Sequence, residues 1–306
     1  GNFVSTDNGV TSSKASGTVT VNGKQKVILY GTITDPASGV GSIEFTLNGK
    51  VVAPSSLLYT TSADTLTDWE KAKGAAYVSY STVTNKTAIT GWKAEFSNTV
   101  IVDGSLKAVV TDVAGSSAPN NILSFLKDDI APVPTITTAS ADINGINDIS
   151  GTVDEANSPA SIQLFYATSK WGTGNSATFS TTNDASVAEL TRRGWTEIPL
   201  DSDPEKTPVF GGYTQANKIY NWSFKNFNFN TAGGENSAAK ATGASLGKST
   251  LYILPVVRDA AGNCNAFTIG DPDASGNVKY TWDLSKAITF TVDMNKDRPT
   301  LQVTNI

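Results

Sequence analysis

Short runs in which apolar and polar residues alternate make up most of the chain. In the run 42–52, Ile43, Phe45 and Leu47 are separated by polar residues and are followed by Asn48-Gly49. Such alternation gives a strand one buried face, and Asn-Gly favours a hairpin turn because both residues tolerate positive φ. The same pattern predicts strands in the first half at 18–21, 27–30, 42–52, 76–84, 92–96, 105–110 and 122–126. In the second half it predicts strands at 146–153, 161–167, 196–200, 218–227, 250–257 and 287–292.

One segment in each half has the signals of a short helix. Residues 64–73 begin at Asp64, which can cap a helix, and are followed by Gly74, which favours its end. Asp184 and Gly194 flank the corresponding segment in the second half. We therefore expect one short helix in each half, which covers one end of a β-sheet core.

The order of these elements repeats along the chain. Gly31-Thr32 recurs as Gly151-Thr152, 120 residues later, and 110–116 (VTDVAGS) recurs at 257–263 (VRDAAGN). Self-similarity at a long period indicates one folding unit used twice. The predicted organisation is a tail at 1–16, a domain at 17–129, a linker at 130–133, and a second domain at 134–294 with insertions at 194–219, 231–249 and 270–283. Residues 299–306 match the opening of the second domain, and we expect a third repeat to begin there.

The composition argues against several classes of function. The 306 residues carry a formal net charge of −5, which disfavours a surface that follows nucleic-acid phosphates. Histidine is absent, which removes imidazole acid–base chemistry, histidine-containing triads and histidine-ligated zinc. Cys264 is the single cysteine, so no intramolecular disulfide forms, and we expect it to fill a small space beside a turn. No apolar run reaches the length of a membrane crossing, so we expect no membrane insertion within this segment.

The order of the motifs resembles that of bacterial Ig-like domains. The matching elements are GT-[IV]-x-[DE] at 31–35 and 151–155, SIEF at 42–45, a tryptophan-bearing strand, VRDAAGN at 257–263 and the junction KDDIAP at 127–132. The resemblance implies an all-β fold of two tandem immunoglobulin-like β-sandwich domains, each with a short helical insertion, and the first strand of a third repeat. Such domains occur as tandem repeats in secreted and cell-surface proteins of the adhesin type, which implies an extracellular or cell-surface location.

Calcium is the first candidate ligand, because acidic residues gather at the predicted domain ends. Ca²⁺ takes six to eight oxygen ligands, and carboxylates at Gly-bearing turns can supply them. Members of the resembled family sometimes hold Ca²⁺ where two repeats meet. The candidate ligands are Asp112, Asp128, Asp129, Asp154 and Glu155 at the first junction and Asp259, Asp293 and Asp297 at the second. The alternative is that each of these carboxylates only bonds the backbone of its own turn.

Aromatic residues in the second half are candidate sugar-binding platforms. Sugar rings stack on exposed aromatic faces. Four aromatic residues fall in or beside the segments that only the second half has: Trp171, Trp195, Tyr213 and Trp282. The alternative is that these rings cover a small hydrophobic patch. Trp92 and Trp222 recur at equivalent positions, and we expect both in the core.

Carboxylates are the remaining groups for acid–base catalysis. Those beside prolines are Asp201, Asp203, Glu205, Asp271 and Asp273. We expect them to lie in solvated turns, so the chain is not expected to be an enzyme, and no cofactor other than Ca²⁺ is expected. The expected function is a non-catalytic extracellular stalk or adhesion module of a bacterial surface protein. Its partners would be neighbouring repeats and a host protein or glycan bound by the second domain's insertions. The alternative is an accessory carbohydrate-binding module of a glycan-degrading enzyme.

Overall fold

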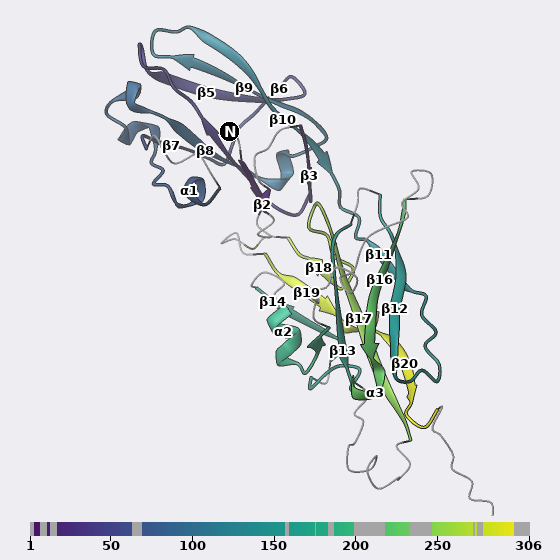
Figure 1. Cartoon of the computed structure of the whole chain (residues 1–306). Coiled ribbons are helices and arrows are strands. Elements are labelled where there is room, and N and C mark those ends of the chain that lie inside the picture. Colours follow the sequence, from purple (N-terminus) through teal and green to yellow (C-terminus); the bar gives the residue numbers. More distant parts are fainter. Residues whose placement is uncertain are drawn as a thin grey trace, which may run out of the picture. The chain divides into compact units, whose positions relative to one another are not determined.

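The structure is a computed structural model, and the chain divides into two compact units (Figure 1). Unit 1 comprises Gly1–Ile130 and Ile269–Val278, and unit 2 comprises Ala131–Thr268 and Lys279–Ile306. The described residues are 3–6, 11–12, 17–62, 69–156, 159–174, 176–182, 187–198, 218–232, 247–271, 273 and 278–296. Tyr213, Asp297, the carboxylates at 201–205 and the predicted third repeat at 299–306 lie outside them.

Unit 1 is a sandwich of two five-stranded sheets. The sheets have the orders β2-β1-β4-β8-β7 and β3-β10-β9-β5-β6. The first contains β1 (Phe3–Thr6), β2 (Thr11–Ser12), β4 (Val27–Thr32), β7 (Ser56–Thr60) and β8 (Gly91–Phe96). The second contains β3 (Thr18–Val21), β5 (Val40–Leu47), β6 (Lys50–Val52), β9 (Gly104–Asp112) and β10 (Ser117–Lys127). Neighbouring strands are antiparallel, except that β3 runs parallel to β10.

The core of unit 1 follows from the alternation seen in the sequence. Ile43, Phe45 and Leu47 of β5 are buried, whereas the residues between them are exposed or half-buried. The Phe45 ring meets Trp92 and Phe96 of the opposite sheet edge-on, with ring centroids 5.3 and 5.2 Å apart. Edge-to-face contacts of this kind add to the burial of apolar area that drives folding.

Short helical turns connect the strands of unit 1. They are α1 (Trp69–Gly74) and the 3₁₀ turns η1 (Tyr80–Thr82), η2 (Lys86–Ala88) and η3 (Asn98–Val100). The prediction of a strand at 76–84 was wrong, because this segment makes only one isolated bridge, Val78 to Tyr59, before η1 begins. One strand of unit 1 that was not predicted from the sequence is β7, which pairs with β8.

The segment predicted as a tail, 1–16, contributes the two strands β1 and β2. β1 pairs with β4, whose backbone N–H and C=O groups would otherwise lie on an open edge. Phe3 is buried with Tyr30 and Ala72 in a small cluster separate from the main core. The alternation of Phe3 and its neighbours was too short to stand out in the sequence.

Unit 2 is a sandwich of a three-stranded and a four-stranded sheet, with a third sheet added. The sandwich sheets have the orders β11-β12-β16 and β15-β13-β17-β20, and the added sheet has the order β14-β19-β18. The sandwich strands are β11 (Val133–Ile136), β12 (Ile146–Asp154), β13 (Pro159–Ala167), β15 (Thr196–Glu197), β16 (Ile219–Asn228), β17 (Lys248–Asp259) and β20 (Ile288–Asp293). The added strands are β14 (Thr178–Thr181), β18 (Phe267–Ile269) and β19 (Tyr280–Asp283).

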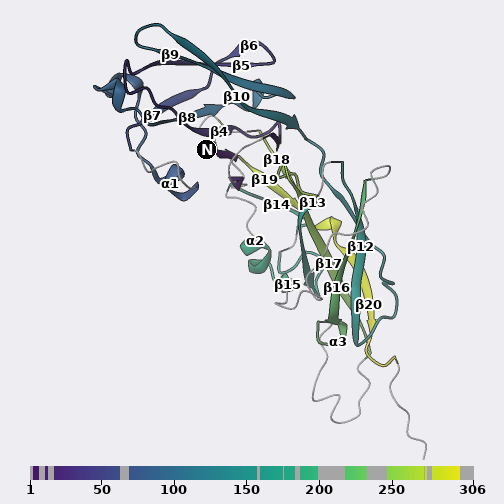
Figure 2. The same cartoon turned by 45° about the horizontal axis from the view of Figure 1, so that its top comes forward.

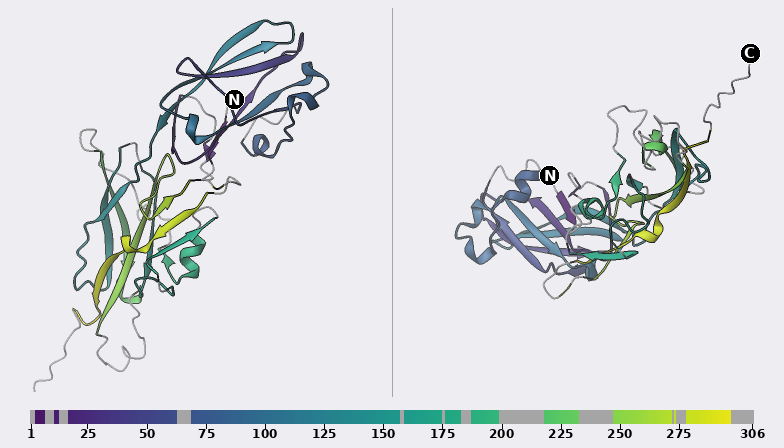
Figure 3. Two further views of the ribbon diagram at one scale, coloured as in Figure 1. Left: turned by 180° about the vertical axis from the view of Figure 1, so that it is seen from behind. Right: turned by 90° about the horizontal axis from the view of Figure 1, so that it is seen from below.

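The added sheet gives unit 2 a second hydrophobic core. Along β17, Leu251, Ile253 and Val257 belong to the sandwich core, while Leu254 and Val256 between them are buried as well. A strand buried on both faces must be covered on both sides. The cover on the second side is the added sheet with α2 (Val187–Arg192), which Figures 2 and 3 show beside one another. The predicted insertion at 270–283 therefore contains β19 and is in part a structural layer.

The helix signals of the second half are realised in α2. Gly194, with φ of 79°, follows the helix, and Trp195 N–H donates to the Leu190 carbonyl while Gly194 N–H donates to that of Thr191. This pair of bonds is the Schellman arrangement in which glycine ends a helix. Unit 2 also contains α3 (Phe229–Ala232) and the 3₁₀ turn η4 (Leu284–Lys286). None of the helices in the described ranges has the length and apolar character that a membrane crossing requires.

Candidate functional site

The repeated motif at 110–116 and 257–263 builds the same hairpin turn in each unit. In unit 1, Asp112 accepts a hydrogen bond from Ser116 N–H at 2.8 Å. In unit 2, Asp259 accepts from Asn263 N–H at 2.9 Å and from the Asn263 side-chain amide at 2.8 Å. The glycine in each turn has a positive φ, which the motif requires at that position. Turn chemistry therefore accounts for the presence of Asp in both copies.

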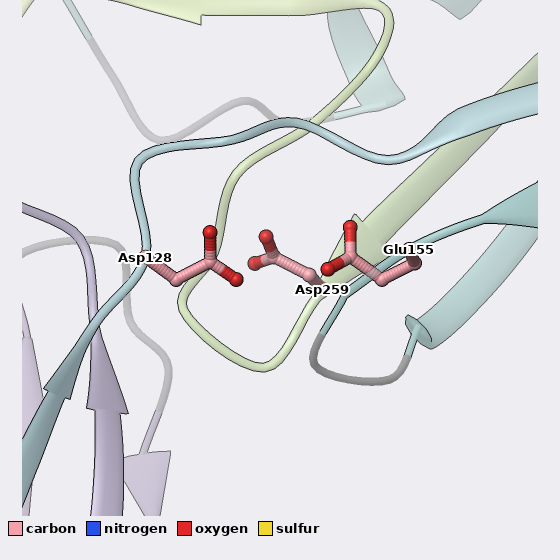
Figure 4. A group of neighbouring side chains, drawn as sticks. All are labelled: Asp128, Glu155 and Asp259. Carbon is pink, nitrogen blue, oxygen red and sulfur yellow. The ribbon is translucent and has the colours of Figure 1, made fainter. Parts of the chain in front are cut away.

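Two of the predicted calcium ligands lie together within unit 2. Glu155 follows β12 and Asp259 ends β17, and Figure 4 shows the two side chains next to each other. One carboxylate oxygen of Glu155 lies within 4.8 Å of one of Asp259. Both side chains are buried, each at 2% exposure. We call Glu155 and Asp259 the carboxylate group.

The local backbone holds each member of the carboxylate group in place. The backbone N–H of Glu155 donates a hydrogen bond to the Lys218 carbonyl at 3.2 Å. Asp259 is fixed by its two bonds to Asn263. The carboxylates are thus positioned by β-strand ends and turns.

The chemistry of the carboxylate group suits a hard cation. Like charges at this distance repel one another, and burial removes the water that would screen them. A divalent cation offsets both costs, and carboxylate oxygens are the ligands that Ca²⁺ takes. Glu155 and Asp259 supply charge and oxygen atoms of the right kind for such an ion.

The other predicted ligands are not part of the carboxylate group. Asp128 lies in unit 1, where it is buried, its backbone N–H donates to the Val21 carbonyl and its Oδ1 accepts from Ile130 N–H at 3.0 Å. Asp129 accepts from Gly23 N–H and pairs with Lys127, and Asp154 lies exposed at the end of β12. Asp293 accepts from Asn295 N–H at 3.1 Å and lies 3.5 Å from Lys248. Asp112 accepts the hydrogen bond from Ser116 N–H in the hairpin turn of unit 1. Of the carboxylates considered for acid–base chemistry, Asp271 forms an exposed ion pair with Lys24 at 2.8 Å.

The predicted aromatic platforms are largely internal. Trp195 and Trp282 are buried at 1% and 0% exposure, so the expectation that they offer exposed faces was wrong. Trp282 stacks on Phe179 with ring centroids 6.0 Å apart and meets Phe267 at 5.1 Å in the second core of unit 2. Trp171 is half-buried, with the Lys170 ammonium 4.9 Å from its ring centroid.

The strand orders define the class of the protein as a tandem of immunoglobulin-like β-sandwiches. In both units two sheets face each other, and each sheet pairs strands that are not consecutive in the sequence. The first sandwich also has the parallel pairing of β3 with β10. An all-β, Ig-like fold was predicted from the sequence, and it is confirmed. The bounds predicted for the domains stay a prediction.

Comparisons with known proteins find similarity only among solved structures. No family model matches the chain, and no curated protein matches it. The fibronectin(III)-like modules of Clostridium thermocellum CbhA share 12% identity over 98% of this chain and 100% of that one, with a TM-score of 0.35. The tandem Ig repeats of Dlar share 10% identity over 96% and 98%, with a TM-score of 0.22. The Bacteroides ovatus protein SGBP-B, solved with a mixed-linkage heptasaccharide, shares 10% identity over 90% of this chain and 43% of that one, with a TM-score of 0.20. The strand orders of the two units define the Ig-like fold independently of these similarities.

Proposed function

We propose that the chain is a non-catalytic, load-bearing stalk module of a bacterial surface protein. The observation that carries this proposal is the way in which each sandwich is closed. In unit 1, β3 near the start of the sandwich pairs in parallel with β10 at its end, with Thr18 to Val21 registered against Ser124 to Lys127. In unit 2, Ile143 forms a parallel bridge with Val292 of the last strand, β20.

Parallel pairing of a segment near the start of a unit with the last strand of that unit gives mechanical resistance. When the chain is pulled along its length, the two strands of such a pair are drawn past each other, so their hydrogen bonds are loaded together and not one after another. The pair in unit 1 extends from the bond of Ser124 N–H to the Gly17 carbonyl to that of Asp128 N–H to the Val21 carbonyl. In unit 2, Ile143 N–H donates to the Thr291 carbonyl and Asp293 N–H donates to the Ile143 carbonyl. A spacer between a cell surface and its surroundings needs this property.

Single-molecule pulling of the whole chain from its two ends tests the proposal. We expect two separate unfolding events with distinct force peaks, one for each unit. Val19→Pro removes a backbone N–H from β3 and should lower the unfolding force of unit 1 alone. Val51→Pro is the matched control, because Val51 lies on the short edge strand β6, outside the β3–β10 pair. The proposal is wrong if neither unit gives a force peak, or if Val19→Pro and Val51→Pro lower the force equally.

We propose further that the carboxylate group binds Ca²⁺. The supporting observation is the burial of Glu155 and Asp259 in unit 2, with one carboxylate oxygen of each within 4.8 Å of the other. An ion that binds only the folded state raises stability by about 2.7 kcal/mol at one hundred times its Kd, which corresponds to roughly 5–10 °C in Tm. Thermal unfolding in Ca²⁺ and in EDTA measures this shift.

The neighbouring residues Asp154 and Glu155 provide a matched pair of variants. Glu155→Gln removes one ligand charge from the carboxylate group and should abolish most of the Ca²⁺-dependent shift in Tm. Asp154→Asn changes an exposed carboxylate one residue away and should keep the shift. A wild-type Tm that is the same in Ca²⁺ and EDTA, or a shift that survives Glu155→Gln, contradicts calcium binding here without bearing on the mechanical proposal.

A further inference from the structure

Each unit has a pocket beside the strand that precedes its helix. In unit 1 the pocket has a volume of about 540 Å³ and lies by the end of β7 and by α1; it is lined by Thr60, Thr61, Ser62, Lys71, Gly74, Ala75 and Ala76. In unit 2 the pocket has a volume of about 360 Å³ and lies by β14 and α2; it is lined by Ser180, Thr181, Thr182, Glu189, Arg192 and Lys279. Both volumes fall in the range of small-molecule sites.

The two pockets occupy the same place in the sequence repeat. Thr60, Thr61 and Ser62 correspond to Ser180, Thr181 and Thr182 at an offset of 120, the same offset that relates Gly31 to Gly151. All six residues carry a hydroxyl group. The residue before each triplet is a buried aromatic, Tyr59 in unit 1 and Phe179 in unit 2. We call these two sets the hydroxyl triplets.

Sheet pairing does not explain why the hydroxyl triplets recur. In unit 1 the strand β7 pairs with β8 within the sandwich, whereas in unit 2 the strand β14 pairs with β19 in the added sheet. The two strands thus have different partners and different surroundings, yet at the end of each lies a hydroxyl triplet that lines a pocket together with residues of the following helix. What the two places share is the pocket.

Hydrogen bonds hold the hydroxyl triplets in position. Thr90 donates from its N–H and its hydroxyl to the Thr60 carbonyl, and its hydroxyl also lies 2.9 Å from the Ser62 carbonyl. In unit 2 the Ser180 hydroxyl lies 3.1 Å from that of Thr281 on β19. Thr61, Ser62 and Thr182 are exposed, so their hydroxyls are presented on a fixed backbone. Sites of this kind lose less entropy when a ligand binds.

Each pocket is positive within an acidic chain. The whole chain has a formal net charge of −5. Lys71 supplies the only charge among the described lining residues of the first pocket. In the second pocket Glu189 pairs with Arg192, and Lys279 supplies an additional positive charge. The described lining of both pockets contains no aromatic ring, so neutral sugars that bind by stacking are not favoured.

We propose that the two pockets bind an acidic saccharide, one uronic acid residue in each. The lysine ammonium pairs with the uronate carboxylate, and the triplet hydroxyls other than that of the buried Thr60 exchange hydrogen bonds with the ring hydroxyls. A chain of uronic acid residues then has two sites on one molecule of the protein. The proposal is independent of the load-bearing and calcium proposals, because it uses none of the residues on which they rest.

Isothermal titration with tri-galacturonate tests the proposal. We expect two sites for each chain, and we expect Lys71→Gln and Lys279→Gln each to weaken one site by about tenfold. Thr61→Val and Thr181→Val should weaken the same sites, because each removes a hydroxyl and keeps the side-chain shape. Lys50→Gln is the control, since Lys50 is an exposed lysine on β6 that lines neither pocket.

Three results would overturn the proposal. The first is no heat of binding with tri-galacturonate at millimolar concentration. The second is equal binding of a neutral glucan trisaccharide, which would remove the role of charge. The third is equal binding of inorganic phosphate, which would show an anion site with no preference for sugar hydroxyls. Circular dichroism of each variant shows that it is folded, so loss of binding is assigned to the pocket.

Discussion

Gly31 lies directly opposite Trp92 across the paired strands β4 and β8, and the indole ring covers the glycine. A methyl group added to Gly31 would overlap Cζ2 of Trp92. Unit 2 has the same arrangement, because Gly151 of β12 is registered against Trp222 of β16 and an added methyl group would lie 2.5 Å from Cζ2 of that ring. The repeated Gly-Thr and Trp of the sequence are therefore two halves of one packing contact.

Replacing Gly31 by alanine should destabilise unit 1. The added methyl group forces the Trp92 ring out of its place in a close-packed core, at a cost of about 1–3 kcal/mol. Gly151→Ala should do the same to unit 2, where the added group also meets the Thr135 carbonyl. Urea unfolding followed by tryptophan fluorescence measures both effects.

Gly74→Ala is the matched control for this experiment. Gly74 ends α1, has no positive φ, and has open space where the methyl group would go. We expect its free energy of unfolding to change by less than about 1 kcal/mol, in the stabilising direction. The double variant Gly31→Ala with Trp92→Leu should lose less stability than the two single changes added together, because the smaller side chain admits the methyl group. Strict additivity would contradict the contact.

The repeat made the sandwiches predictable, because the residues that recur in both halves are those that both sandwiches need for packing and turns. Gly31, Trp92 and Asp112 have counterparts in Gly151, Trp222 and Asp259, and each pair has one structural role. The calcium candidates were less predictable. The sequence placed acidic residues at strand ends, but which ones converge depends on contacts such as that between Glu155 and Asp259, which lie more than one hundred residues apart.

The added sheet of unit 2 was not predicted from the sequence, for a different reason. Its strands are three or four residues long and stand beside Gly-, Asp- and Ser-rich segments, so the surroundings suggested a loop. One signal was present: Tyr280 and Trp282 alternate with polar residues, and both are buried. A second was the unbroken apolar run from Leu254 to Val257 in β17, which is typical of a strand covered on both faces.

Trp282→Ala tests whether the added sheet is a structural layer. The Trp282 ring has no exposed surface and packs on Phe179 and Phe267, so its removal should cost about 3–5 kcal/mol. The loss should appear in the thermal unfolding of unit 2 and leave that of unit 1 unchanged. Trp171→Ala is the control, since Trp171 is only half-buried, and we expect a smaller loss. Equal effects of the two changes would contradict a second core.

Cys264 should be unreactive in the folded protein. Its thiol is buried, burial raises the pKa of Cys264 to about 11, and the thiolate is the form that reacts with disulfide reagents. Because it is the only cysteine in the chain, its labelling reports on unit 2 alone. We expect no modification by 5,5′-dithiobis(2-nitrobenzoate) at pH 8 in buffer and one thiol per chain in concentrated urea. Rapid labelling in buffer would show that the turn after β17 opens readily.

Alkaline pH should weaken unit 1 through Tyr59. Burial raises the pKa of Tyr59 to about 12, with a further contribution from Tyr80, whereas an unfolded tyrosine titrates near pH 10. The unfolded state therefore loses its proton first, so the stabilisation is complete below about pH 10 and is lost as the pH rises toward 12. By pH 11 the loss should be about 1 kcal/mol, after allowance for partial solvent screening. Urea unfolding from pH 8 to 11 should show this decline for unit 1, and Tyr59→Phe should remove that part of it. An identical pH dependence in the variant would contradict the assignment to Tyr59.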